Sequence, residues 1–332
     1  MDSSERLDLL ATSNGVIAAL AMDQRKSLRR MIANAASHSP NDICDAKLTE
    51  FKSAVAEILT PHVSAILLDP EYGMEAAGLR ATDCGLLLAY ELDGYENPRP
   101  NRMLALMPQL SVRKLQEAGA SGIKILLHYS PLDDRAANEE KKALIERIGN
   151  ECQAQDIPFF LEPVLYDPVV SGRAPMSDFD FAKAKPALVR EMMREFFRDI
   201  YKVDVLKVEF PVAAAYVEGS EVNCGQTAYS REEALNWFRT IDAEARSPYI
   251  YLSAGVSTET FFASLCLANE AGARYSGVLC GRAMWQDGVP VYARHGVQAL
   301  RQWLSTQGVA NVRRMNDLIS NATPWRDRRR PA

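Results

Sequence analysis

The chain has 332 residues, of which 47% are hydrophobic and 24% are charged, and its net charge is −5. This is the composition of a globular protein with an extensive core, and it lacks the excess of positive charge that nucleic-acid binding requires. Because no apolar stretch approaches membrane-spanning length and the N-terminal residues do not resemble a secretion signal, we expect a cytoplasmic protein with no membrane partner.

Eight apolar, strand-forming runs recur along the chain, and most of them end at a polar residue or at proline. They cover residues 15–22, 63–68, 85–90, 122–128, 157–163, 203–211, 249–253 and 277–281. Between the runs, apolar residues have helical spacing, as in 48–59, 144–152 and 189–200. Ser230 and Glu233 have the spacing of a capping box, and Pro186 suits the first turn of another helix.

Strands that alternate with helices in this way predict an α/β fold, a single (β/α)8 TIM barrel spanning residues 1–332. We expect a short N-terminal extension and a solvated, basic C-terminal tail that contains Arg326, Arg328, Arg329 and Arg330. A doubly wound open sheet is the alternative. It has less support because no strand is followed by G-x-G-x-x-G and the chain has no G-x-x-x-x-G-K-[ST].

Six cysteines and four histidines are scattered through the chain. They form no C-x-x-C pair and no H-E-x-x-H motif, so we expect reduced thiols, no metal site and no cofactor.

Polar residues cluster at the ends of the predicted strands, where a barrel of this kind carries its catalytic groups. Taken singly, Asp69 and Glu91 are better interpreted as structural ion pairs or helix caps. The full set is Asp23, Asp69, Glu91, Glu162 and Ser253 at five strand ends, Lys124 and Lys207 within two strands, and Gly281 and Arg282 after the eighth.

Lys207 lies inside an apolar run that stops at Pro211. Burial lowers the pKa of a lysine, and a neutral amine is the nucleophile that Schiff-base chemistry requires. Lys124 and Lys207, if both face the barrel mouth, would lower each other's pKa further. The alternative is a structural lysine that pairs with Glu209 or Asp204 or reaches solvent, which is the commoner case for a single strand.

The neighbouring residues suit the same chemistry. Glu162 and Asp23 could move protons during carbinolamine dehydration and carbon–carbon cleavage. The loops after the seventh and eighth strands, where barrels commonly bind phosphate, carry Ser253, Gly255, Gly281 and Arg282.

Six segments in this order resemble the class I tagatose 1,6-bisphosphate aldolases, and the similarity runs from about residue 15 to residue 325. The segments are residues 21–25, 67–73, 157–162, 204–209, 249–257 and 277–283. The resemblance implies a metal-independent aldolase that cleaves a ketose 1,6-bisphosphate into dihydroxyacetone phosphate and glyceraldehyde 3-phosphate. It also implies a homo-oligomer.

The resemblance further implies a role for each site residue. Lys207 forms the Schiff base, Glu162 is the general acid and base, and Lys124 and Asp23 bind substrate and assist proton transfer. The residues that hold the phosphate next to the ketone are Ser253, Gly255, Gly281 and Arg282. Gln24 and Arg25 border the same pocket.

Two segments depart from the tagatose enzymes. Residues 162–164 look more like the related sulfofructose-phosphate aldolases, and Lys26 and Ser27 also differ. A sulfonate is therefore the alternative to a phosphate at C6, and the candidates to bind that group are Arg25, Arg99, His128 and Arg173. The sequence is also compatible with a phosphosugar isomerase or synthase in which Lys207 is only a charge partner, and with a non-catalytic sugar-phosphate-binding regulator. Tagatose and fructose are not distinguished by the sequence.

Overall fold

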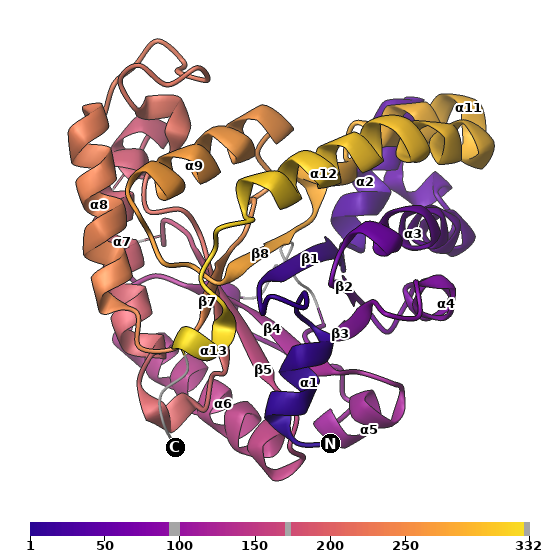
Figure 1. The fold of residues 1–332 in the computed structure, drawn as a ribbon, viewed down its shortest axis with the longest axis horizontal. Helices are drawn as coiled ribbons and strands as arrows, with labels where there is room; N and C mark the ends of the chain where they lie inside the picture. The colour runs from indigo at the N-terminus through magenta and orange to yellow at the C-terminus, as the bar shows by residue number, and fades with distance from the viewer. Residues whose placement is uncertain (93–99, 170–173, 329–332) are drawn as a thin grey trace.

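The computed structural model describes residues 1–92, 100–169 and 174–328 (Figure 1). Eight parallel strands pair in chain order, and β1 pairs with β8 to close the barrel. The predicted TIM barrel is therefore confirmed, and the open sheet is excluded. The strands are β1 Ile17–Met22, β2 Ala65–Leu68, β3 Gly85–Ala89, β4 Gly122–Tyr129, β5 Phe159–Leu165, β6 Val205–Val208, β7 Tyr249–Tyr251 and β8 Gly277–Cys280.

Helices surround the barrel in Figure 1, as expected for strands buried on both faces. None of those in the described residues combines the length and apolar composition needed to cross a bilayer. They are α1 Ser3–Leu9, α2 Lys26–Ala36, α3 Asp45–Leu59, α4 Met74–Leu79, α5 Val112–Glu117, α6 Arg135–Ala154, α7 Asp178–Phe196, α8 Arg231–Glu244, α9 Thr258–Glu270, α10 Arg282–Trp285, α11 Gly288–Trp303, α12 Val309–Leu318 and α13 Trp325–Arg328.

The strands begin within two residues of their predicted starts. The capping box is also confirmed, because Ser230 accepts the N–H of Glu233 at the start of α8. The prediction for Pro186 is wrong, since α7 begins eight residues earlier, where Ser177 accepts the N–H of Asp180. Pro186 lies inside α7 and is buried, so the packed apolar face of this long helix tolerates the missing backbone hydrogen bond.

Alternate residues of each strand point into the barrel, and the inner ones in its lower half are apolar. They include Ala19, Leu87, Phe160 and Ile250. Leu7 and Leu10, at the end of α1, and Trp325, the first residue of α13, belong to the same cluster and close the N-terminal end of the barrel. Figure 1 shows both short helices beside the strands. The N-terminal half of the barrel interior is thus filled by apolar side chains.

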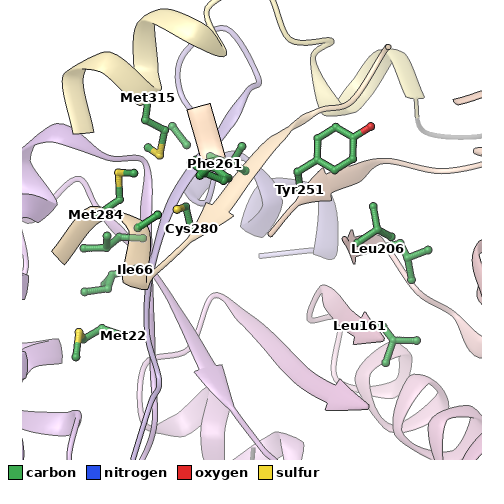
Figure 2. Packing of buried hydrophobic residues seen from close by; sticks show 14 of the residues in the cluster. Met22, Ile66, Leu161, Leu206, Tyr251, Phe261, Cys280, Met284 and Met315 are labelled. Atoms are coloured by element: carbon green, nitrogen blue, oxygen red, sulfur yellow. The ribbon is translucent and has the colours of Figure 1, made fainter. Parts of the chain in front are cut away.

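A second, larger apolar layer lies between the strands and the surrounding helices. Figure 2 shows part of it, with Met22 and Ile66 from neighbouring strands and Met284 and Met315 from α10 and α12. This layer holds the strand ends in a fixed frame, because densely packed interiors yield little to side-chain movement.

The expected solvated tail is wrong for Arg328, whose side chain is 9% exposed, whereas the Arg326 side chain is 55% exposed. Arg326 pairs with Asp8, and Arg328 pairs with Asp242 and donates to the carbonyl of Arg274 at 2.8 Å. The burial of Trp325 brings both arginines against the body of the protein. Arg329 and Arg330 lie outside the described residues.

A buried ion pair joins α3 to two strand ends. Lys52 is fully buried, forms an ion pair with Asp69 after β2, and donates to the carbonyl of Met22 at 2.7 Å. Asp69 also accepts the N–H groups of Glu71 and Tyr72 in the turn after β2. Its interpretation as a structural ion pair is confirmed, but it does not cap a helix, because the N-cap of α4 is Gly73. Lys52 thus holds the backbone directly before Asp23.

We predict that Lys52→Met lowers the free energy of unfolding by about 3–5 kcal/mol, because it leaves the Asp69 carboxylate buried without its cation. Lys47→Met on the same helix is the matched control, since Lys47 is exposed and contacts Glu50 at 3.4 Å on the surface. That variant is expected to change the free energy by less than about 1 kcal/mol. Urea unfolding measures both, and equal midpoints for the two variants would contradict the prediction.

Candidate active site

The inward-facing positions of the strands bring the candidate residues to one level of the mouth. On β4, Ile123, Ile125 and Leu127 belong to the outer layer, so Lys124 faces the interior. Leu161 pairs with Leu206 in the β5–β6 register. The next residues along these strands, Glu162 and Lys207, therefore lie side by side in the register.

Glu162 bridges the two lysines. Its Oε1 lies 2.8 Å from Nζ of Lys207, and its Oε2 lies 2.9 Å from Nζ of Lys124. The three residues are at most 3% exposed. A carboxylate is thus in contact with both amines in a site that water hardly reaches.

Lys124 contacts two more carboxylates besides Glu162. Its Nζ lies 2.7 Å from Oδ2 of Asp23 and 2.7 Å from Oε1 of Glu91. The interpretation of Glu91 as an ion-pair residue is confirmed, but its partner is an amine of the site itself. We did not predict Glu91 as a site residue from the sequence. It continues the alternation of the inner residues Leu87 and Ala89, and this pattern was a usable signal.

The carboxylates and lysines control one another's charge. Burial alone would raise the pKa values of Asp23 and Glu162, but Lys124 and Lys207 outweigh burial and lower both. Burial alone would lower the pKa of Lys124, but Asp23, Glu162 and Glu91 outweigh it and raise that pKa. The predicted lowering of the pKa of Lys124 is therefore wrong, because three carboxylates contact this amine.

The structural partners considered for Lys207 are engaged elsewhere. Glu209 pairs with Lys185 at 3.1 Å and accepts the N–H of Leu165. Asp204 accepts the N–H of Phe159 at 2.9 Å. Lys207 is 3% exposed, and its ion pair is with Glu162.

The loops after β7 and β8 form a small cavity beside Lys207. Its lining includes Gln24, Ser253, Gly255, Gly281 and Arg282. The structure thus brings the predicted phosphate residues together with the lysine.

Both glycines of this cavity are needed for the approach of other groups. Gly255 has φ +76°, and a Cβ there would lie 2.5 Å from Cζ of Arg282. A Cβ on Gly281 would lie 2.7 Å from the carbonyl oxygen of Ala21. Because any side chain at position 255 would collide with the guanidinium, Gly255 leaves room for Arg282.

Gln24 and Arg25 follow Asp23 but have different surroundings. Gln24 is 8% exposed, and its Oε1 has no hydrogen-bond partner within the described part of the chain. Arg25 donates from Nη2 to the carbonyl of Glu91 at 2.8 Å. Gln24 lines the cavity beside Lys207, whereas Arg25 supports the backbone that carries Glu91.

Of the candidates for the C6 group, His128 is buried on the inner face of β4. Burial, Arg102 and Lys141 lower the pKa of His128 to about 4, so its ring is neutral at pH 7. Arg99 and Arg173 lie outside the described residues. Across residues 1–92, 100–169 and 174–328, no three His, Cys, Asp or Glu side chains are grouped so that they could hold a metal ion.

Comparisons with known proteins agree with this geometry. A family model described as DeoC/LacD family aldolase matches residues 17–287. Tagatose 1,6-diphosphate aldolase of Staphylococcus aureus is 46% identical over 324 residues, which cover 97% of each chain. Tagatose 1,6-diphosphate aldolase 2 of Streptococcus mutans is also 46% identical, over 96% of this chain and 95% of that protein.

A fructose-bisphosphate aldolase from Plasmodium falciparum, solved in complex with TRAP and a small-molecule inhibitor, has the same fold. The TM-score is 0.65, the identity is 14%, and the match covers 94% of this chain and 93% of that chain. The family model and the full-length relatives confirm the resemblance found in the sequence. The chain belongs to the DeoC/LacD family of aldolases.

Proposed function

We propose that the protein is a Schiff-base aldolase that cleaves D-tagatose 1,6-bisphosphate into dihydroxyacetone phosphate and glyceraldehyde 3-phosphate without a metal ion. The observation that carries this proposal is the 2.8 Å contact between the buried Lys207 amine and Glu162, beside a cavity that Arg282 also lines. This arrangement joins a nucleophile, its proton acceptor and a cation for the phosphate.

Imine formation uses the Lys207–Glu162 contact. Transfer of one proton from Lys207 to Glu162 leaves a neutral amine, which attacks C2 of the ketose. The carbinolamine must then lose its hydroxyl group as water, and Glu162 returns the same proton to that leaving oxygen. The product is a protonated imine on Lys207, and Glu162 is again a carboxylate.

The imine accepts the electron pair of the C3–C4 bond. Glu162 takes the proton of the C4 hydroxyl as this bond breaks, and glyceraldehyde 3-phosphate leaves. The enamine that remains on Lys207 takes the proton back at C3, and water hydrolyses the resulting imine to release dihydroxyacetone phosphate. The water consumed here balances the water released earlier.

Lys124 keeps its charge through this sequence, because three carboxylates raise its pKa. It can therefore stabilise negative charge that develops on the substrate oxygens in a water-poor site. Asp23 orients Lys124 through their 2.7 Å contact and lies close enough to the site to bind a substrate hydroxyl. Arg282, with Ser253, Gly255, Gly281 and Gln24, would hold the C1 phosphate.

The names of the two relatives support tagatose 1,6-bisphosphate as the substrate. A 6-deoxy-6-sulfofructose 1-phosphate substrate is the second candidate, because residues 162–164 and Lys26 and Ser27 depart from the tagatose enzymes. A substrate that carries two phosphates does not cross membranes, so we place the protein in the cytoplasm. We also propose a homo-oligomer, on the resemblance to the family alone.

We predict that borohydride with dihydroxyacetone phosphate leaves a covalent adduct on Lys207, measured by peptide mass spectrometry. Lys207→Arg should lose both adduct and cleavage, since arginine keeps the charge but cannot form the imine. A chelator should leave turnover unchanged. An active enzyme without the adduct, or full activity in Lys207→Arg, would instead support the isomerase or synthase alternative.

The charge of the cluster predicts how stability depends on pH. The folded-state pKa of Asp23 is lowered below its ordinary value of 3.8, so its contribution is present above about pH 4 and lost as the pH falls further. Asp23→Asn should therefore lower the free energy of unfolding by about 2 kcal/mol at pH 7, and this deficit should shrink below about pH 4.

Urea unfolding of the wild type and Asp23→Asn between pH 3 and 8 measures this difference. Asp317→Asn, on the exposed surface of α12, controls for substitution at a carboxylate outside the cluster. A deficit for Asp23→Asn that stays constant down to pH 3 would show that its origin is packing rather than charge.

A further inference from the structure

The substrate proposed above has a second anionic end, which must lie away from Arg282. Lys207 is on β6. On one side of it around the barrel are β7 and β8, whose loops carry the C1-phosphate residues, and on the other side are β5 with Glu162 and β4 with Lys124. A sugar with C1 near Arg282 and C2 at Lys207 therefore extends its remaining carbons toward β4 and β5.

His128 lies where that end of the sugar would reach. It shares the inner face of β4 with Lys124, and it pairs in the register with Val164, two residues beyond Glu162 on β5. Two residues of strand correspond to about 7 Å toward the mouth. His128 is thus one inner position above the reacting groups.

Tyr166 joins His128 to a charged segment. The rings of His128 and Tyr166 lie 6.2 Å apart between centroids in a T-shaped arrangement. The Arg102 guanidinium lies over the Tyr166 ring, 4.7 Å from its centroid. Arg102 is exposed, and it shares the Tyr166 ring with His128 as a common neighbour.

The backbone that carries Arg102 is held in a costly conformation. Asn101 and Arg102 have φ 51° and 48°. Asparagine tolerates this left-handed region, but for Arg102 it costs roughly 1–2 kcal/mol. The Tyr166 hydroxyl donates to the carboxylate of Asp133, lies 3.2 Å from the carbonyl oxygen of Asn101, and accepts from the fully buried Lys141 at 3.0 Å. Strain of this kind persists where the surroundings over-determine it, and it is often found at ligand clamps.

We propose that Arg102 and His128 form the subsite for a tetrahedral oxyanion on C6 of the substrate, with Tyr166 as the residue that positions Arg102. Arg102 supplies the charge, and the neutral His128 ring supplies one N–H donor. Lys141 is not a ligand, because Asp133 contacts it at 2.9 Å and it is fully buried; it supports Tyr166. This inference rests on the proposed function.

The test compares substrates that differ only at C6. We expect Arg102→Gln to lower kcat/KM for D-tagatose 1,6-bisphosphate about 10- to 100-fold, the range for hydrogen bonds to charged groups. The same variant should leave kcat/KM for D-tagatose 1-phosphate unchanged, since that substrate has no C6 oxyanion. Arg313→Gln, an exposed arginine on α12, is the matched control and should change neither value.

Two more variants separate the roles. His128→Phe keeps a ring but no donor, and it should produce a smaller loss that is also confined to the C6-charged substrate. Tyr166→Phe keeps the ring under Arg102 but loses the hydroxyl contacts with Asn101, Asp133 and Lys141. It should therefore raise KM for the bisphosphate and leave kcat for D-tagatose 1-phosphate unchanged. Thermal melting confirms that each variant is folded.

A third substrate, 6-deoxy-6-sulfofructose 1-phosphate, identifies the oxyanion. If Arg102→Gln lowers kcat/KM selectively for the substrate with a C6 phosphate or for the one with a C6 sulfonate, the result supports the subsite and identifies the oxyanion that it binds. An equal loss with D-tagatose 1-phosphate, or no loss with any substrate, overturns it. Trapping of dihydroxyacetone phosphate by borohydride does not involve C6, so its absence in the wild type would overturn the proposed function separately.

Discussion

The Glu162 carboxylate, in contact with two buried amines, is the interaction on which the rest of the site depends. It lies within 2.9 Å of Nζ of both Lys124 and Lys207. Buried charges are stable only when they are paired, and Glu162 is the carboxylate that pairs with Lys207 at its inner position. The surroundings of the two amines nevertheless differ, because Asp23 and Glu91 also contact Lys124.

The barrel makes such a cluster possible by separating apolar from polar layers along its axis. Residues such as Ala19 and Phe160 fill the lower interior, and the charged residues occupy the next inner positions toward the mouth. The Lys52–Asp69 pair stabilises the wall from outside and holds the carbonyl of Met22. The charged groups therefore stand on a dry, packed base, where electrostatic interactions are stronger than in water.

Much of this arrangement could be predicted from the sequence. Apolar runs of strand length that end in charged residues predicted the barrel, and the order of those endings predicted that Asp23, Lys124, Glu162, Lys207 and Arg282 lie at one mouth. The resemblance to the family predicted that Lys207 faces Glu162, and the structure confirms it. The residues alone left Glu209 open as the partner, because the choice depends on the register between β5 and β6. The opposite effects on the pKa values of Asp23 and Lys124 also required the distances.

The residues that were missed have a common reason. Lys52 and Lys141 lie on helix faces among apolar residues, where a long side chain usually extends to solvent. Both are fully buried, because a carboxylate from another element meets each amine. Arg102 belongs to a short 3-10 turn, Pro100–Arg102, whose left-handed backbone no local pattern indicated. Contacts outside the helix or turn itself decided all three.

The floor of the barrel has a consequence for biosynthesis. Leu7 and Leu10 emerge from the ribosome early, but Trp325, which packs with them, is translated some three hundred residues later. A nascent chain therefore keeps the base of its core open to water during nearly all of its synthesis. Long-range contacts of this kind slow folding, so the base of the core closes only after α13 has been made and docks.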